Sequence, residues 1–233
     1  AGGAAALAPS WLRSAAPPTP SPAPNILFFL IDDQRNDTLG CAGHPIIKTP
    51  VIDLLAATGV RFENAFVTTA ICAASRASIF TSLHERTHRY TFGTPPICAE
   101  HVQNSYPVRL RQAGYRTGFI GKFGVDVAGG NATIRSTLFD SMEPIGRNPY
   151  LHPQPDGTTR HETELCGDRA IAFLRSQPDD KPFCLSVSFN AVHAEDSDLV
   201  DHYPWPEAEN GLYDDVSMPP PRLNDPELFT SQP

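Results

Sequence analysis

Two adjacent carboxylates, Asp32 and Asp33, follow an apolar run at residues 25–31. Neighbouring carboxylates repel each other unless a cation or a hydrogen-bond donor neutralises them. Where the chain leaves the extended conformation, both can turn toward one pocket and offer the hard oxygen ligands that Ca²⁺ and Mg²⁺ prefer. The pair therefore indicates a divalent-cation site. The alternative interpretation is an acidic turn in which one aspartate caps a helix.

A second group of reactive side chains lies at residues 72–76, with the sequence Cys-Ala-Ala-Ser-Arg. We expect Cys72 at or near the start of a helix, where free backbone N–H groups favour anions. Arg76 follows one turn later and can return to the same place, where its guanidinium can brace a bound oxygen. The alternative is a buried cysteine that precedes an ordinary amphipathic helix.

Two further polar residues come directly after strand-like segments. Lys122 follows residues 116–121, and His193 follows shortly after an apolar run at residues 182–189. In open α/β sheets, ligands bind beyond the carboxyl ends of the strands. The placement of Lys122, His193 and the two aspartates therefore predicts one shared active site.

The segments that position these residues alternate between strands and helices. Apolar runs predict strands, the first of them buried on both faces of its sheet, at residues 26–31, 60–67, 116–121 and 182–189. Capping residues and helical spacing predict helices at residues 51–58, 73–83, 106–113 and 162–176. Such alternation predicts an α/β fold with a mostly parallel, doubly wound sheet and helices on both faces. From about residue 203 onward, where proline and acidic residues dominate, we expect no regular element.

Composition bounds the partners of this chain. Its 18 basic and 26 acidic residues give a net charge of −8, which argues against a broad nucleic-acid-binding face. A few local basic residues can still hold a small anionic substrate. No apolar run is long enough to span a bilayer. Residues 1–24 are rich in Ala and Pro, and we expect a disordered lead-in that remains after removal of an export signal, which favours a periplasmic or secreted protein.

The cysteines leave the redox compartment open. None of the five forms a CxxC pair, so zinc and thioredoxin-like sites have no support. The odd number allows two disulfides and one cysteine with a separate chemical role. However, Cys184 lies in an apolar run, where a buried free thiol agrees with the sequence as well as a disulfide does.

The sequence around Cys72 resembles the sulfatase signature C-x-(P/A)-S-R. The likeness extends along the chain. Residues 24–33, 49–53 and 59–65 look like the sulfatase N-terminus, residues 114–122 resemble its "GY-x-T…GK" stretch, and residues 188–193 resemble a strand with its following histidine. The resemblance covers about residues 24–193 and implies an alkaline-phosphatase-like α/β fold. It also implies that residues 25–233 are the N-terminal portion of a catalytic domain whose C-terminal half is absent.

The resemblance implies hydrolysis of a sulfate ester. In the family the signature cysteine, here Cys72, is oxidised to formylglycine, and the hydrate of that aldehyde attacks sulfur. The corresponding catalytic residues would be Arg76, Lys122, which contacts formylglycine and sulfate, and His193, which contacts the ester oxygen. The implied partners are a formylglycine-generating maturation enzyme and a sulfated small molecule or carbohydrate.

The resemblance also implies a cation site. Asp32, Asp33 and the formylglycine oxygen of residue 72 would bind Ca²⁺, with Mg²⁺ as a possibility, and the later half of the family's domain supplies further ligands and a second lysine. Gly124 stands where many members have a histidine that supports the formylglycine hydroxyl. His84 and His88 are candidates to replace it, although we expect both to be solvated surface residues.

Two alternatives share this fold. One is a phosphomonoester or phosphonate hydrolase of the same superfamily. The other is a non-catalytic, sulfatase-like binding domain that is never modified at Cys72. The intact Cys72, Ser75, Arg76 and Lys122 argue against the second alternative.

Overall fold

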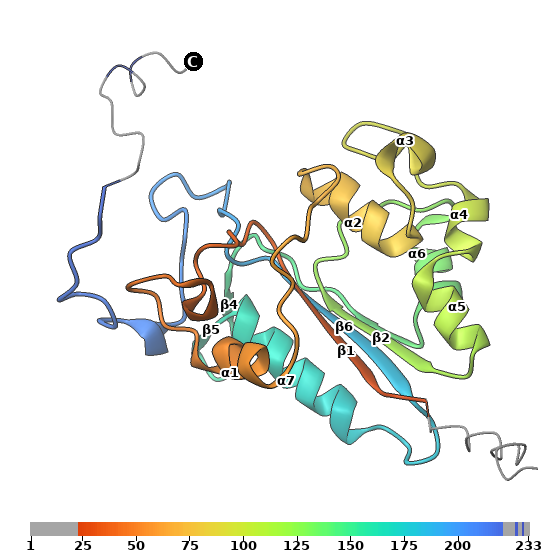
Figure 1. Cartoon of the computed structure of the whole chain (residues 1–233). Coiled ribbons are helices and arrows are strands. Elements are labelled where there is room, and N and C mark those ends of the chain that lie inside the picture. Colours follow the sequence, from red (N-terminus) through yellow and green to blue (C-terminus); the bar gives the residue numbers. More distant parts are fainter. Residues whose placement is uncertain (1–22, 221–226, 228–229, 231–233) are drawn as a thin grey trace, which may run out of the picture.

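A parallel sheet forms the centre of the molecule. The computed structural model describes residues 23–220, 227 and 230, so most of the expected lead-in at residues 1–24 lies outside the described residues. Within the described part, the strands run in the order β1-β6-β2-β3 (Figure 1). Their bounds are Ile26–Ile31 for β1, Phe183–Phe189 for β6, Arg116–Gly121 for β2 and Ser141–Glu143 for β3. The pairing aligns Ile31 with Phe189 and Gly121 with Ser188, so β1, β6 and β2 end at the same edge.

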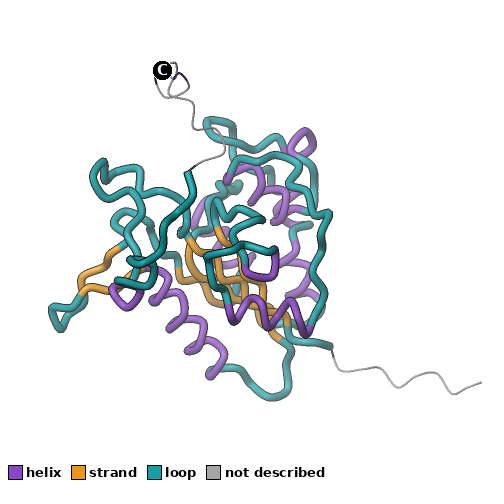
Figure 2. The backbone as a smooth tube through the Cα atoms, turned by 60° about the vertical axis from the view of Figure 1, so that its left-hand side comes forward, coloured by secondary structure: helices purple, strands orange, loops and turns teal. Residues whose placement is uncertain are grey.

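Helices cover both faces of this sheet. Helix α7 (Glu162–Arg175) lies on one face, and α2 (Cys72–Thr81) and α5 (Tyr106–Gln112) lie on the other (Figures 1 and 2). Phe80, Phe119 and Phe139 belong to the core beneath α2 and α5, whereas Phe173 and Leu185 belong to the core beneath α7. This arrangement confirms the predicted doubly wound α/β fold.

Shorter elements connect these layers. They are α1 (Pro50–Thr58), α3 (Glu85–His88), α4 (Ala99–Gln103), α6 (Gly130–Thr133), a π-helical turn (Ile134–Leu138), and two 3₁₀ turns (Gly40–Ala42 and Glu207–Glu209). Strands β4 (Leu151–Pro153) and β5 (Thr159–His161) form a separate antiparallel hairpin. No helix in the described part of the chain is long and apolar enough to cross a membrane.

The strand predicted at residues 60–67 is wrong, because this segment forms neither strand nor helix. Its apolar side chains find no cover: Phe62 is 79% exposed and Phe66 is 86% exposed. A segment with strand-like residues forms a strand only where it can pair with the edge of a sheet and pack one face against the core. Among the described residues, this segment does neither.

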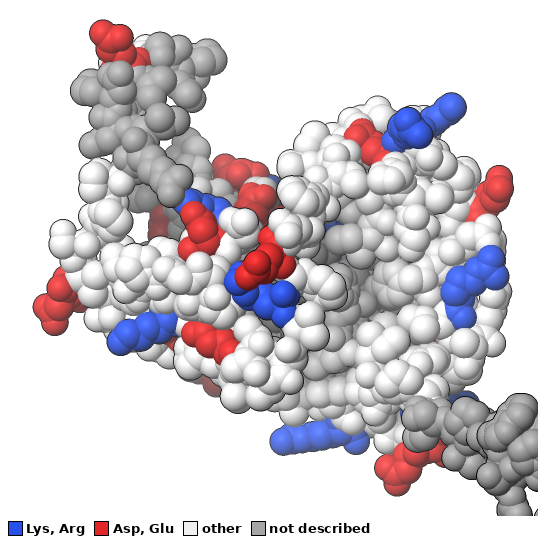
Figure 3. All heavy atoms as spheres, in the orientation of Figure 1, with Lys and Arg blue, Asp and Glu red and all other residues white. Residues whose placement is uncertain are grey.

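Strand β1 also departs from its prediction of burial on both faces. It is the outer strand of the described sheet and pairs only with β6 there. Leu27, Phe28 and Phe29 are between 37% and 50% exposed, and no residue of α1 is buried. Figure 3 shows few charged side chains on this face. We call the exposed apolar residues of β1, α1 and the 60–67 segment the uncovered apolar surface.

Candidate active site

Cys72 is the first residue of α2, as predicted. The preceding residue, Ile71, is extended, so the first-turn amides of the helix lie beside the cysteine with no earlier turn to bond them. Cys72 lines a cavity of about 1040 Å³ that Lys122 and His193 also line. The structure therefore brings three of the predicted catalytic residues to one cavity.

Asp32 lies beneath this cavity in a buried ionic cluster. Its carboxylate forms ion pairs with Lys122 and with Arg76, whose Nη2 is 3.3 Å from the Asp32 oxygen. Arg76 also donates from Nη1 to the Lys122 carbonyl (2.5 Å) and to the Ser188 hydroxyl. The guanidinium thus joins the ends of β1, β2 and β6. Two cations share one carboxylate, so the cluster favours a further anion nearby.

The Arg76 guanidinium is incompletely satisfied. It is only 5% exposed, and burial lowers its pKa, an effect that Asp32 opposes. Its Nη2 finds no hydrogen-bond acceptor of good geometry among the described residues. A buried charged donor without an acceptor is costly, so this position is suited to an additional oxygen ligand.

Asp33 points away from Asp32. Its backbone is left-handed, with φ of 56°, and its side chain is 62% exposed. The Asp33 carboxylate lies 3.6 Å from Nε2 of His193. Within the described residues, no three His, Cys, Asp or Glu side chains converge as a metal-binding group. The structure therefore places the two predicted carboxylate ligands at the end of β1 and the third predicted ligand, Cys72, at the start of α2, without assembling a complete coordination shell from them.

The turn that carries His193 is held by a buried acid, Glu162, at the first position of α7. One Glu162 oxygen accepts the backbone N–H groups of Asn190 (3.1 Å) and Ala191 (3.0 Å). The next amide, of Val192, donates to the Asp32 carbonyl at 3.1 Å. These contacts fix the exit of β6 relative to α7 and β1.

We expect Glu162→Ala to lower the free energy of unfolding by about 2 to 4 kcal/mol, because two backbone donors lose their acceptor. Glu162→Gln retains a carbonyl oxygen at this position and should lose clearly less. Urea unfolding followed by circular dichroism measures both. Glu209→Ala, at an exposed position, is the matched control. Equal losses for the alanine and glutamine variants would contradict the role of the shared acceptor.

Arg147 is a site residue that the sequence did not indicate. Its Nη1 lies 3.0 Å from His193 Nε2 and 3.3 Å from the Ala194 carbonyl, and its Nη2 pairs with Asp196. His193 Nδ1 lies 2.8 Å from the same carbonyl and 2.5 Å from Arg147 Nη1, so Arg147 and the Ala194 carbonyl both contact this ring. Arg147 follows β3, a strand of three residues, so neither a motif nor a long apolar run marks its position.

Tyr90 also lines the cavity and was missed. Its hydroxyl accepts from the Asp126 backbone amide at 2.9 Å and donates to the Asp126 carboxylate at 3.2 Å. Burial raises the pKa of this phenol; the Asp126 backbone amide opposes the rise, whereas the Asp126 carboxylate and Cys72 add to it. No family motif or strand end points to residue 90.

The two histidines near Gly124 in sequence behave differently. His84 is exposed, as expected, whereas His88 is buried and the prediction of a solvated side chain is wrong for it. His88 lies 3.1 Å from the Ser78 hydroxyl and accepts the Tyr90 amide, and burial lowers its pKa. Neither histidine lines the cavity of Cys72.

Gly124 provides space for Arg76. Its φ is +66°, and a Cβ atom at this position would lie 2.9 Å from Arg76 Cδ. The guanidinium that this carbon carries is held by Asp32, Ser188 and the Lys122 carbonyl. The glycine therefore permits the position that Arg76 takes in the ionic cluster.

All five cysteines are unpaired, so the option of two disulfides is not adopted. Cys166 and Cys184 are buried in the core, and burial raises the pKa of both thiols, to about 11 for Cys184. These two thiols are packing residues. Cys72 is distinguished from them by its place at a helix start and at a cavity wall.

Curated proteins that resemble this chain are sulfatases. It is 31% identical over 176 residues to an N-acetylglucosamine-6-O-sulfatase of Bacteroides thetaiotaomicron, covering 73% of this chain and 31% of the relative. It is 28% identical over 241 residues to an arylsulfatase of Clostridium perfringens, covering 87% of this chain and 48% of the relative. The chain thus spans less than half the length of these two relatives.

Solved structures show the same likeness. One, described as a complex with its substrate D-glucosamine-2-N,6-O-disulfate, has a TM-score of 0.68 and 27% identity and matches 85% of this chain and 39% of its own. A phosphonate monoester hydrolase of Agrobacterium radiobacter has a TM-score of 0.60 at 23% identity, covering 73% of this chain and 41% of its own, and this shows a shared fold. The family model named Sulfatase matches residues 24–216. The chain therefore belongs to the sulfatase family.

Proposed function

We propose that the protein is a sulfuric ester hydrolase whose nucleophile is formylglycine made from Cys72. The observation that carries this proposal is the position of Cys72, at the start of α2 and on the wall of the cavity that Lys122 and His193 share. The hydrate of the aldehyde supplies one hydroxyl to attack sulfur and a second whose collapse expels sulfate. A maturation enzyme that oxidises Cys72 is the required partner.

The cationic residues stabilise the sulfate group. Lys122 and Arg76 lie together around Asp32, and the amides at the start of α2 add further donors. These groups are fixed by the ends of three strands before substrate arrives. Removing one preorganised donor of this kind typically costs on the order of 10²–10³ in turnover.

His193 is positioned to assist departure of the alcohol. The Ala194 carbonyl lies 2.8 Å from Nδ1, and delivery of a proton from Nε2 requires the ester oxygen to replace Arg147 as the partner of this nitrogen. Arg147 and Asp33 lie on this side of the ring, at 3.0 Å and 3.6 Å from Nε2 respectively. Arg147 therefore orients the imidazole that acts on the leaving group.

Asp32 and Asp33 are the proposed cation ligands, together with an oxygen of the modified residue 72. Both carboxylates are hard donors at the end of β1, and the unpartnered Arg76 donor nearby suits an added oxygen ligand. They fit part of a Ca²⁺ shell, which takes about six to eight oxygens. A bound Ca²⁺ or Mg²⁺ would lower the pKa of a hydroxyl that it coordinates.

We expect Asp33→Ala, in the enzyme that carries this chain, to remove both the bound cation and the turnover. Asp33 supplies an exposed carboxylate whose one close ion-pair contact among the described residues is His193, 3.6 Å away. Calcium titration calorimetry and an aryl sulfate assay measure the two effects. Asp37→Ala, which removes an exposed partner of Arg35, is the control. Full activity in a chelator-washed, metal-free sample would contradict the proposed cation site.

Paired sulfate and phosphate esters of the same alcohol test the reaction type. We expect the sulfate ester to be the better substrate of the matured enzyme. Preference for the phosphate ester would indicate the phosphohydrolase alternative, for which the structural likeness shows the fold alone. An unmodified Cys72 and no turnover of either ester would indicate the non-catalytic alternative.

We further propose a sulfated carbohydrate as the substrate class and a location outside the cytoplasm. The names of the Bacteroides relative and of the substrate in the similar structure support the first proposal. A Drosophila relative, named as an extracellular sulfatase and 30% identical over 193 residues, supports the second.

A further inference from the structure

His193 lines a second cavity besides the one that Cys72 lines. This second space, of about 410 Å³, has walls formed largely by rings: Tyr150, His161, Phe189, Tyr203 and Trp205. We call it the aromatic cavity. Because His193 borders both spaces, a group bound in the aromatic cavity lies next to the imidazole that faces the reacting sulfate.

Two stacked rings form the buried wall of the aromatic cavity. Tyr150 and His161 have ring centroids 5.3 Å apart and nearly parallel planes, and both are at most 2% exposed. The Tyr150 hydroxyl donates to the His193 carbonyl at 2.7 Å. Burial raises the pKa of Tyr150 and lowers that of His161, and both shifts favour the neutral form of the ring. This wall is thus tied directly to the backbone of His193.

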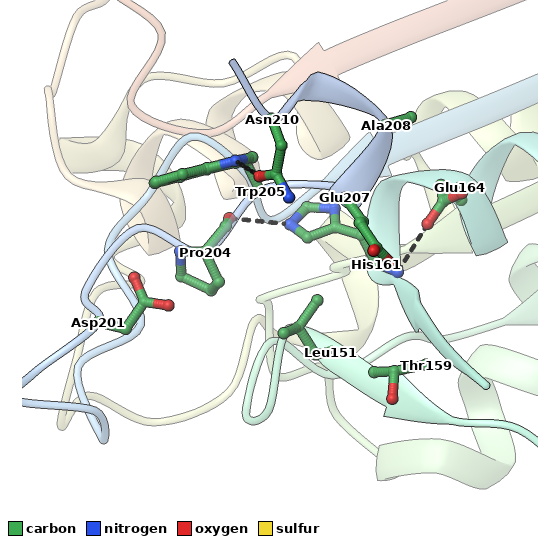
Figure 4. Close-up of a pocket in the computed structure, with 10 residues that line it drawn as sticks. All are labelled: Leu151, Thr159, His161, Glu164, Asp201, Pro204, Trp205, Glu207, Ala208 and Asn210. Carbon is green, nitrogen blue, oxygen red and sulfur yellow. Dashed lines mark hydrogen bonds between the residues drawn. The ribbon is translucent and has the colours of Figure 1, made fainter. Parts of the chain in front are cut away.

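Tyr203 and Trp205 form the exposed side of the cavity. They are 62% and 57% exposed, yet their segment is anchored on both sides (Figure 4). His161 Nε2 donates to the Pro204 carbonyl at 3.1 Å, and Trp205 Nε1 donates to Asn210 at 2.7 Å. Figure 4 draws a neighbouring pocket that His161, Pro204 and Trp205 also line, together with the acidic residues Glu164, Asp201 and Glu207. An exposed indole with a fixed ring plane is a stacking surface.

The loop from His193 to Trp205 is held as one unit. The Glu195 amide donates to the His202 carbonyl at 2.7 Å and closes the loop. The Glu195 carboxylate in turn accepts the Tyr150 amide at 3.1 Å. The imidazole and the aromatic wall are therefore positioned together before a ligand binds, which reduces the entropic cost of binding.

We propose that the aromatic cavity is the subsite for the ring that carries the scissile sulfate. This rests on the proposed function, in which His193 meets the ester oxygen. With sulfur on the Cys72 side of that oxygen, the alcohol must extend past His193. The volume falls in the range of about 300–1,000 Å³ that is usual for small-molecule sites. Aromatic walls bind flat apolar faces, which an acyclic alcohol does not present.

Two kinds of alcohol share this chemistry. A pyranose offers a face of C–H groups, and an aryl alcohol offers a π face. Two polar groups of the wall are already engaged, since His161 bonds the Pro204 carbonyl and the Gln34 amide nitrogen bonds the Arg35 carbonyl. The cavity therefore binds the apolar face of the ring and leaves ring hydroxyls to the solvent.

Binding to the unmodified chain tests the subsite independently of catalysis. The sequence holds two tryptophans, so a Trp11→Phe protein reports Trp205 fluorescence alone. The probes are glucosamine 6-sulfate, phenyl sulfate and ethyl sulfate. We expect saturable emission changes with one or both ring sulfates and none with ethyl sulfate, and the responding probe identifies a pyranose or an aryl source. The proposal would be overturned if all three probes changed the emission equally, or if none of them changed it.

Calorimetry on variants supplies the second measurement. Trp205→Ala and Tyr203→Ala should each weaken binding of the responding ring sulfate by about three- to tenfold. Phe62→Ala, which removes an exposed ring outside the cavity, should change nothing. Unchanged affinity in both cavity variants would also overturn the subsite. Ring binding without hydrolysis by the complete, matured enzyme that carries this chain would contradict the proposed function and leave the subsite intact. Hydrolysis by that enzyme without any preference for ring sulfates over ethyl sulfate would contradict the subsite and leave the proposed function intact.

Discussion

Replacing Cys72 with alanine in the complete enzyme that carries this chain is expected to reduce sulfate ester hydrolysis by about 10⁶-fold, the loss typical of removing an enzyme nucleophile. Alanine cannot be oxidised to an aldehyde, so neither of the two hydroxyls needed for attack and sulfate release can form. The fold should persist, because alanine suits the first turn of α2 and Cys72 is only partly buried. Turnover of an aryl sulfate and thermal unfolding measure the two outcomes.

The matched control is Cys98→Ala. Cys98 is exposed and lies directly before a short helix, α4, and so resembles Cys72, the first residue of α2. Unlike Cys72, it does not line the cavity that Lys122 and His193 share. This variant should keep full turnover. Mass spectrometry of the peptide containing residue 72 should show the aldehyde or its hydrate in active protein. An active preparation with a quantitatively unmodified thiol would refute the formylglycine proposal.

The second large effect is an absence of measurable turnover by the 233-residue chain alone, even after maturation. Asp32, Asp33 and one oxygen of residue 72 give too few ligands for Ca²⁺, and the described residues hold no complete metal-binding group. We expect further polypeptide to pack here, because β1 has no partner on its outer edge among the described residues and the apolar surface beside it is uncovered.

An aryl sulfate assay with added Ca²⁺ decides this prediction. The arylsulfatase of Clostridium perfringens, which is about twice as long as the segment it shares with this chain, serves as the positive control. We expect turnover by that enzyme and none by the isolated chain. Robust, metal-dependent turnover by the chain alone would show that its own residues complete the site.

The sequence predicted the parts of the fold that carry strong local patterns. Strands β1 and β6 are largely apolar segments of six and seven residues, α1 and α5 begin or end near the residues expected to cap them, and α7 matches the segment with helical spacing. Since β1, β2 and β6 end at one edge, the polar residues that follow them were predicted to meet, and the structure brings them together. Three of the four predicted catalytic residues line one cavity, and Arg76 lies directly beneath it.

What the sequence did not predict depends on tertiary contacts. Arg147 and Tyr90 reach the site from irregular or very short elements, so no periodicity marks them. Glu162 was expected only as the start of a helix, whereas its burial and its role under Asn190 and Ala191 follow from the packing of α7 against β6. Residues 60–67 show the opposite case, in which an apolar pattern lacks the neighbour that would make it a strand.

Gly124 makes the histidine common at this place in the family incompatible with this site. Any side chain there begins with a Cβ atom 2.9 Å from Arg76 Cδ, and its backbone would have to keep a φ of +66°. Arg76 cannot move aside cheaply, because Asp32, Ser188 and the Lys122 carbonyl hold its guanidinium. Positions 76 and 124 are therefore epistatic. A lineage or an engineer that restores the histidine must first find another conformation for the arginine, and a library that varies residue 124 alone will recover chiefly glycine.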